Sequence, residues 1–370
     1  MRIAQVAPLY ERVPPEGYGG TERVVAYLTD ALIEQGHQVT LFASGDSITP
    51  ARLAATCPRS LRLDDSCVDP LAPHLVMLER VFAEAHRFDV VHFHTGFLHF
   101  PAARRRRFAQ LTTMHGRLDL PELVPLFREF VEMPVVSISN DQRRPLSDAN
   151  WVATVHHGLP ATLLPFSPRP RGYLAFLGRI SPEKRLDRAI DIAHGVGMPL
   201  KVAAKIDRID REYFAQTIEP RLSEPGVEFV GEIGEHDKAA FLGGATALLF
   251  PIDWPEPFGM VMIEALACGT PVIAWPHGSV PEVLEDGVTG FHVRSVEQAI
   301  AAVRRLHTIS RARCRAEFER RFTADRMAKS YVEAYERLIA RSGFSSLEAV
   351  NDGRRVGPES ALPRRGYRAS

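Results

Sequence analysis

Short apolar segments rich in Val, Ile and Phe recur along the first part of the chain and alternate with stretches of helical periodicity. Uninterrupted apolar runs are typical of strands that are buried on both faces, and the stretches between them have the spacing of amphipathic helices. The expected strands are 2–7, 38–43, 89–94, 110–115, 134–139 and 151–157. The expected helices include 22–35 and 75–86. This alternation predicts a parallel sheet covered by helices on both faces.

A proline-rich segment interrupts the pattern. Pro165, Pro168 and Pro170 cannot all lie inside one element, so a linker is predicted at 166–171. The alternation then restarts, with strands expected at 172–178, 200–204, 227–231, 247–250 and 271–275. The expected helices of this second part are 182–194, 235–242, 260–268, 296–307, 312–321 and 324–341.

The predicted fold class is therefore α/β, with two doubly wound Rossmann-like domains that face each other across a cleft. The first domain covers residues 1–165 and the second covers 172–322. Residues 323–341 are expected to form a helix that packs back on the first domain, and the Gly-, Pro- and Arg-rich tail 342–370 is expected to be disordered. Because ligands bind outside the carboxyl ends of parallel strands, the cleft is the expected site, although this placement selects no chemistry.

Composition narrows the class of protein. A chain of 370 residues with 45% hydrophobic residues suits two cores better than one. Its 45 basic and 45 acidic residues cancel, so nothing in the charge balance indicates nucleic acid as a partner. The four cysteines lack the spacing of a metal site or a disulfide framework. With no apolar run typical of a signal peptide or a membrane span, we expect a cytoplasmic protein, which leaves open a peripheral contact with the inner face of a membrane.

The segment 254–274 is the most informative stretch for chemistry. A proline-rich turn with Glu256 follows an expected strand, and a helix opens around Phe258, Gly259 and Met260, with Glu264 about one turn further along. A helix N-terminus favours phosphate, and glycine allows the close approach of a backbone. A carboxylate on each side can accept hydrogen bonds from sugar and ribose hydroxyls. This arrangement fits a nucleotide-sugar better than two solvated acids at a helix end.

Two further segments carry candidate phosphate-binding groups. Gly178 and Arg179 end an expected strand, and Lys184 is expected in the first turn of the next helix. Cations there oppose the helix dipole unless an anion is bound, although solvated surface cations are the alternative interpretation. Gly19 and Gly20 follow the first strand, with Thr21 as a plausible N-cap, and would allow a close approach of phosphate or acceptor where a plain turn is the simpler interpretation.

Histidines mark the carboxyl ends of two expected strands. His115 and His94 are placed to face the cleft, where a neutral imidazole could bind a hydroxyl, or else they are core residues with internal partners. His92, His94 and His99 could suggest zinc, but neither a carboxylate nor a cysteine completes the set, so no metal is predicted. Arg104 opens a run of four arginines that is either a solvated loop or a contact for anionic lipid or an anionic acceptor.

The pattern Glu-Pro-Phe-Gly…Glu-Ala…Gly-Thr-Pro-Val around Glu256 and Glu264 resembles the signature of the retaining glycosyltransferases of family 4, the group 1 glycosyltransferases of GT-B fold. The resemblance extends from residue 1 to about residue 340. It implies that His115 is the active-site histidine, that Arg179 and Lys184 bind the donor diphosphate, and that Ser139 lines the acceptor side. Lys205 stands where many relatives have glycine, and either reaches the nucleotide or only ends a strand. Arg185 and His157 stand where the family usually has glycine and asparagine.

These expectations together predict a retaining, metal-independent transferase. It would move a hexose from a nucleotide diphosphate sugar, UDP-linked rather than GDP-linked, to a small-molecule, glycan or lipid-linked acceptor. The chain lacks an Asp-x-Asp sequence, so the cations and a helix N-terminus would stabilise the leaving diphosphate in place of a metal. The predicted catalytic set is His115, Glu256, Arg179 and Lys184. The alternatives are a catalytically silent nucleotide-sugar binding protein, or a nucleotide-sugar epimerase of the same fold.

Overall fold

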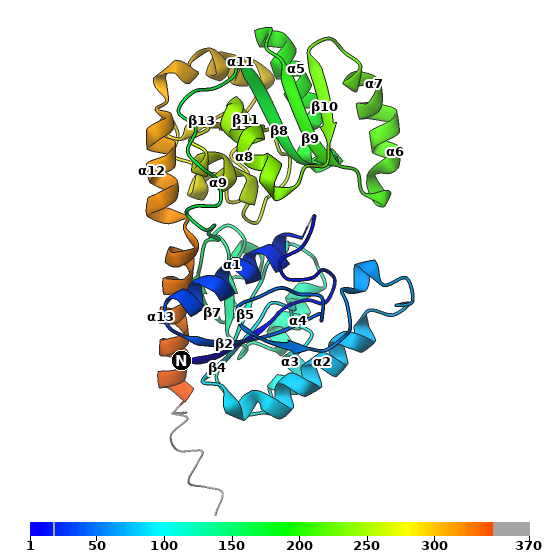
Figure 1. The fold of residues 1–370 in the computed structure, drawn as a ribbon, viewed down its shortest axis with the longest axis vertical. Coiled ribbons are helices and arrows are strands. Elements are labelled where there is room, and N and C mark those ends of the chain that lie inside the picture. Colours follow the sequence, from blue (N-terminus) through cyan, green and yellow to red (C-terminus); the bar gives the residue numbers. More distant parts are fainter. Residues whose placement is uncertain (18, 343–370) are drawn as a thin grey trace, which may run out of the picture.

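The computed structural model of the protein describes residues 1–17 and 19–342, and the tail expected to be disordered lies outside these residues from 343 onward. Two parallel sheets, each flanked by helices, lie one above the other (Figure 1). The α/β fold class with two doubly wound sheets is therefore confirmed.

The first sheet has seven parallel strands in the order β3-β2-β1-β4-β5-β6-β7. The chain reverses its direction of travel across the sheet between β1 and β4, which is the switch point at which ligands bind in such folds. The strands are β1 (Arg2–Val6), β2 (Gln38–Ala43), β3 (Arg52–Ala55), β4 (Val90–Phe93), β5 (Gln110–Thr113), β6 (Val135–Ser137) and β7 (Trp151–Thr154).

The second sheet has six parallel strands in the order β10-β9-β8-β11-β12-β13. Its switch point lies between β8 and β11, so the carboxyl end of β8 opens into a crevice. The strands are β8 (Tyr173–Arg179), β9 (Leu200–Lys205), β10 (Val227–Gly231), β11 (Ala245–Phe250), β12 (Val272–Ala274) and β13 (Gly290–His292).

Helices connect the strands and cover the sheets. Those between the strands of the first sheet are α1 (Gly20–Glu34), α2 (Leu71–Glu84), α3 (Phe100–Ala103) and α4 (Leu123–Glu129). The second half contains α5 (Leu186–Val196), α6 (Arg211–Tyr213), α7 (Glu219–Leu222), α8 (Glu235–Gly244), α9 (Met260–Ala267), α10 (Val280–Val283), α11 (Val296–Arg304) and α12 (Arg311–Arg321).

The last helix, α13 (Ala324–Ser342), returns to the first sheet, and Figure 1 shows it running down beside the lower body. Tyr331 and Tyr335 on this helix are completely buried. The Tyr335 side chain accepts a hydrogen bond from Gln5 in β1 at 3.2 Å, and Tyr331 bonds to Thr113 in β5 at 2.8 Å. The helix thereby joins the end of the chain to the middle of the first sheet.

Three expectations about local structure were wrong. The edge strands β3 and β13 were missed because they are only 4 and 3 residues long and carry no long apolar run. The helix expected from residue 182 is a 3₁₀ turn, Pro182–Lys184, followed by Arg185 in the left-handed region and then by α5. Thr21 is not the N-cap of α1, because Gly19 takes that position and Thr21 lies inside the first turn.

None of the helices within the described residues is both long enough and apolar enough to cross a membrane.

Candidate active site

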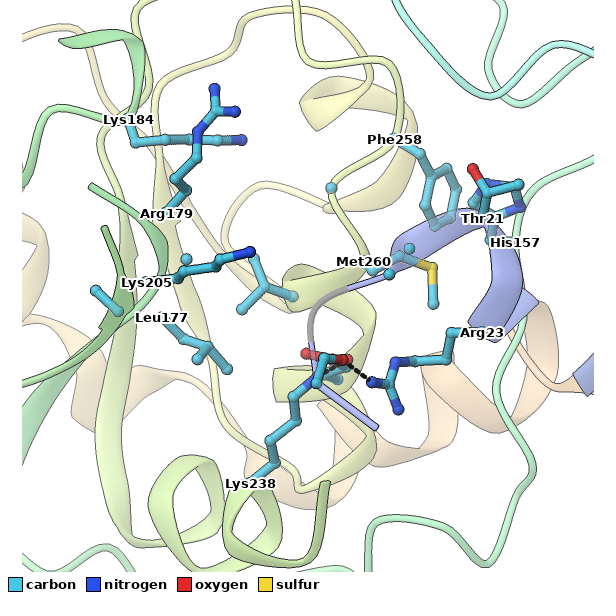
Figure 2. Close-up of a pocket in the computed structure, with 18 of the residues that line it drawn as sticks. Thr21, Arg23, His157, Leu177, Arg179, Lys184, Lys205, Lys238, Phe258 and Met260 are labelled. Carbon is cyan, nitrogen blue, oxygen red and sulfur yellow. Dashed lines mark hydrogen bonds and ion pairs between the residues drawn. The ribbon is translucent and has the colours of Figure 1, made fainter. Parts of the chain in front are cut away.

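A cavity of about 550 Å³ opens between the two sheets. Its walls come from the loop after β1 and the start of α1 on one side, and from the ends of β8 and β9 and the start of α9 on the other. Figure 2 shows Arg179, Lys184 and Lys205 projecting from one side of this space, with Thr21 and Arg23 on the opposite side. The carboxyl ends of strands from both sheets therefore meet at a single site.

Most of the residues predicted for the site line this cavity. They are Gly19, Gly20, His115, Gly178, Arg179, Lys184, Lys205, Glu256, Phe258, Gly259, Met260 and Glu264. His94 and Ser139 are not among the lining residues. His94 is buried beneath His115, and the hydroxyl of Ser139 accepts a hydrogen bond from the backbone N–H of Gln142 at 3.1 Å. Ser139 therefore stabilises the turn after β6, and its predicted place on the acceptor side stays a prediction.

Lys184 and Glu256 meet in the cavity although they come from different loops. The Lys184 ammonium donates to Oε2 of Glu256, and Nε1 of Trp254 donates to the same oxygen at 3.1 Å. The Lys184 nitrogen also lies 5.0 Å from the centre of the Trp254 ring, within the range of a cation–π contact. The turn before α9 and the loop after β8 are thus joined by one charged pair at the edge of the cavity.

Arg179 is surrounded by carboxylates. It donates to Glu183 at 2.6 Å, and its guanidinium lies 3.5 Å from Asp207 and 3.4 Å from Asp210. Lys205 pairs with Asp207 at 3.2 Å. These contacts hold the two cations at the ends of β8 and β9, and an entering anion would compete with the carboxylates for them.

The start of α9 exposes backbone donors to the cavity. Gly259 has φ of 74°, a conformation that favours glycine, and a Cβ there would lie 2.8 Å from Cε of Met262. Among the described residues no side chain caps α9, and the N–H of Met262 donates to the carbonyl of Gly259 at 3.0 Å, so the N–H groups that a ligand could use are those of the residues before Met262. Gly259 and Met260 both line the cavity, which places this helix N-terminus where an anion would be favoured.

Glu264 has a partner that the sequence did not reveal. It is only 4% exposed, and Lys238 on α8 donates to it at 2.6 Å. A buried carboxylate is stable when it is paired in this way, and both side chains line the cavity. No motif marks Lys238, which lies in the polar first half of α8.

The loop that carries Lys184 has a left-handed backbone conformation at Arg185, although such a conformation favours glycine. Arg185 has φ of 54°, which is a strained region for a residue with a side chain. Its guanidinium donates to Asp187 at 2.7 Å and to Asp253 at 2.9 Å. These ion pairs offset the strain, so the replacement of the usual glycine leaves a left-handed residue directly after Lys184.

A cluster of histidines underlies the opposite side of the cavity. His115 bonds to His94 at 2.8 Å, and the far nitrogen of His94 bonds to Gln5 at 2.7 Å. Burial lowers the pKa of His115 to about 3. Burial lowers the pKa of His94 well below its ordinary value, and protonation of His92, His115 or His157 would lower it further by repulsion. These imidazoles are therefore neutral near pH 7.

His157 belongs to the same cluster and was not predicted as a site residue. Its ring stacks on His115 with centroids 5.3 Å apart, and it meets the Phe258 ring edge-on at 4.9 Å. His157 lines the cavity and is only 4% exposed. The departure from the family's usual asparagine was its only signal in the sequence, and the structure gives it a place between the two halves of the site.

Two contacts bridge the halves at the rim. Arg23 on α1 donates to Glu235 on α8 at 2.7 Å, and the hydroxyl of Tyr27 donates to the same carboxylate. Glu282 accepts backbone hydrogen bonds from Asn140 at 2.8 Å and from Asp141 at 2.7 Å. Arg23 and Glu235 line the cavity, so at least one of these links between the two halves of the chain lies at the site itself.

Two of the four arginines at 104–107 form ion pairs with neighbouring side chains. Arg104 donates to Glu129 at 2.6 Å and to Glu132 at 2.9 Å, and Arg106 pairs with Glu79 at 3.5 Å. These surface pairs support the solvated-loop interpretation. Within the part of the chain that the structure describes, no group of three or more His, Cys, Asp or Glu side chains is arranged to hold a metal ion.

Two family models match the chain, one to each half. The model described as Glycosyltransferase Family 4 matches residues 18–151, and the model described as Glycosyl transferases group 1 matches residues 166–323. The alpha-maltose-1-phosphate synthase of Mycolicibacterium smegmatis is 26% identical over 336 residues, which cover 79% of this chain and 84% of that protein.

Solved structures show the same architecture. A glycosyltransferase involved in avilamycin A biosynthesis has 25% identity and a TM-score of 0.70, over 92% of this chain and 98% of that one. Anabaena HepE in complex with UDP-glucose has 17% identity and a TM-score of 0.68, over 91% of this chain and all of that one, and therefore shows a likeness of fold.

Proposed function

The chain belongs to the group 1 glycosyltransferases and acts on nucleotide sugars, and from this premise we propose that it is a retaining, metal-independent hexosyltransferase that uses a UDP-sugar. The observation that carries the proposal is the convergence of Lys184, Arg179 and the uncapped start of α9 on one cavity that also contains His115. A solved structure of the same fold contains UDP-glucose, which supports the choice of nucleotide.

The cations and the helix N-terminus supply the electrostatic part of the reaction. Negative charge builds up on the diphosphate as the glycosidic bond breaks, and positioned donors lower the energy of that state. In the proposed mode, Arg179 and Lys184 bind the phosphates together with the backbone N–H groups that follow Gly259. Entry of the diphosphate weakens the pair between Lys184 and Glu256, which frees this carboxylate to accept a bond from a sugar hydroxyl. Glu264 accepts from the ribose.

Retention follows from the direction of attack in this proposal. In the proposed mode Glu256 accepts hydrogen bonds from Trp254 and from a sugar hydroxyl, so it does not serve as the nucleophile of a double displacement. We propose instead that the acceptor hydroxyl attacks from the face that the diphosphate leaves. The departing phosphate oxygen takes the hydroxyl proton, and His115 positions a hydroxyl beside the reacting carbon. Closure of the two halves excludes water and limits hydrolysis.

Calorimetry in excess chelator tests the donor and the absence of a metal requirement. We expect a UDP-sugar to bind more tightly than the GDP- and ADP-linked sugars, with an affinity that chelator leaves unchanged. Lys201→Ala provides a matched control for Lys184→Ala, because Lys201 also pairs with a carboxylate, Glu228 at 2.8 Å, but is not among the cavity residues. Binding that disappears on chelation, or that tolerates Lys184→Ala as well as Lys201→Ala, would contradict the proposal.

A further inference from the structure

An unbroken chain of hydrogen bonds runs from His115 in the cavity to the C-terminal helix. His115 bonds to His94 at 2.8 Å, His94 to Gln5 at 2.7 Å, and Gln5 to Tyr335 at 3.2 Å. It continues from Tyr335 to His92 at 2.7 Å, from His92 to Thr113 at 2.7 Å and from Thr113 to Tyr331 at 2.8 Å. Every member except His115 is at least 97% buried, so the chain is shielded from water.

The amide of Gln5 determines which atoms donate and which accept along this series of hydrogen bonds. Its oxygen can only accept, and it faces Nε2 of His94, so that nitrogen carries a proton. Its nitrogen can only donate, and it donates to the Tyr335 hydroxyl. A neutral imidazole has one N–H, so Nδ1 of His94 is an acceptor and Nε2 of His115 must donate to it. Neutral His115 then carries its lone pair on Nδ1.

Nδ1 of His115 is the end of the chain that remains open. This atom is buried and has no hydrogen-bond partner among residues 1–17 and 19–342, although its side chain lines the cavity. A buried acceptor without a partner is costly, so it favours a ligand group that can donate to it. Nδ1 of the stacked His157 is also buried and has no hydrogen-bond partner among the described residues. Hydroxyl groups are the donors that a sugar substrate brings.

We propose that Gln5 and His94 are positioning residues for the transfer, because they hold the proton of His115 on Nε2 and thereby present Nδ1 as an acceptor to a substrate hydroxyl. This inference rests on the proposed function for the identity of the hydroxyl, but the tautomer is a property of the protein alone. In the opposite tautomer, Nδ1 would carry hydrogen and would meet the hydroxyl as a donor. The Gln5 amide thus sets the direction of a hydrogen bond in the cavity without touching the ligand.

The tautomer can be measured directly on the full chain. Protein labelled with ¹⁵N at histidine distinguishes a protonated ring nitrogen from one with a lone pair by its chemical shift, and His115→Asn identifies the His115 signals by their loss. We expect Nδ1 of wild-type His115 to be unprotonated. A protonated Nδ1 in the wild-type protein would overturn the proposal whether or not any substrate has been found, which separates its failure from that of the proposed function.

Gln5→Met tests the positioning role, with Tyr331→Phe as the matched control. Methionine keeps the length of glutamine but removes both hydrogen bonds, whereas the control removes one buried hydrogen bond at the far end of the same chain. We expect Gln5→Met to mix the two tautomers of His115 and to lower kcat by about 100-fold, and Tyr331→Phe to keep the wild-type tautomer and kcat. Equal behaviour of the two variants would reject the proposal.

Two binding measurements on Gln5→Met identify the source of the hydroxyl. If it belongs to the donor sugar, the affinity for the intact nucleotide-sugar falls while that for the free nucleoside diphosphate is unchanged. If it belongs to the acceptor, both of these affinities are unchanged and the KM of the acceptor rises. Either result supports the assignment of Nδ1 as the acceptor, and a loss of affinity for the free nucleoside diphosphate would contradict it.

Discussion

Two clusters of side chains meet at the cavity, and they differ in whether their members are charged or neutral. The cation cluster, Arg179, Lys184 and Lys205, keeps its charges and holds each beside a carboxylate. The histidine cluster, His92, His94, His115 and His157, gives up its charge, because burial lowers the pKa of every member. One side of the site is therefore ionic and the other side is polar but neutral.

This difference separates two tasks of a transferase. A diphosphate carries its charge into the site and exchanges one set of ionic partners for another, so paired cations are suited to it. A sugar or acceptor hydroxyl is neutral, and directional hydrogen bonds to fixed imidazoles can orient it without attracting stray ions. The contrast predicts that substitutions in the cation cluster will lower the affinity for the nucleotide. Substitutions in the histidine cluster will lower the transfer rate and leave that affinity unchanged.

The largest effect is expected from His115→Ala. The variant should lower the transfer rate by about 10²–10⁴-fold and leave the affinity for the free nucleoside diphosphate nearly intact, because the nucleotide is held by the other cluster. Initial rates and calorimetry on the same preparation measure both quantities. His99→Ala is the control, because His99 is also fully buried, with a pKa lowered to about 3 by burial, and bonds to Thr112 at 2.9 Å outside the cavity.

The control should lose thermal stability and keep its turnover. If His115→Ala behaves in the same way, His115 is a core residue and the histidine cluster has no part in the reaction. Loss of affinity for the free nucleoside diphosphate in His115→Ala would instead place both tasks on one side and would remove the contrast between the clusters.

A somewhat smaller effect is expected from Lys184→Ala and Arg179→Ala. Each removes one charged donor from the developing anion, which lowers turnover by about 10²–10³-fold, and donor affinity should fall as well. Melting temperatures should change little, because both side chains are partly exposed and their carboxylate partners can be solvated. Unchanged kinetics in either variant would remove that residue from the donor site.

The smallest effect is expected from a change of pH on stability. The histidine cluster and His99 titrate near pH 6.5 in the unfolded chain, whereas burial holds their pKa values lower in the folded state. Below pH 6.5 the unfolded state binds more protons than the folded state, so the free energy of unfolding falls as the pH is lowered. Calorimetric melting between pH 7 and pH 5 should show this loss, reduced in His99→Gln.

Glu183, which pairs with Arg179 on the other side of the cavity, should respond in a lower range of pH. Burial acts to raise the pKa of Glu183, but hydrogen bonds from its own backbone, Ser181 and Arg179 lower it overall. Its stabilising contribution is complete above the ordinary value of 4.5 and is lost as the pH falls through the lowered pKa. A melting temperature that stays constant down to pH 5 would show that the histidines are not buried in neutral form.

Local sequence was informative wherever one short segment supplies both a backbone shape and a functional group. The turn at Glu256, the left-handed Gly259 and the helix after it lie within a few residues of one another, so their chemistry could be predicted together. Ser139 shows what this reasoning does not reveal. It follows β6, and its hydroxyl accepts a hydrogen bond from the backbone N–H of Gln142 in the next turn, which only the course of the chain after the strand decides.

The sequence by itself determined the two sheets, the cleft and the residues around Glu256 and Lys184, because apolar periodicity and the geometry of helix ends act over short distances. Only the tertiary structure decided which side chains meet. Lys238 reaches Glu264 from another helix, His157 stacks on His115, and Gln5 joins His94 to a helix 330 residues away in the chain. Such pairs carry no signal in a single sequence, because a hydrogen bond depends on distance in space and not on separation along the chain.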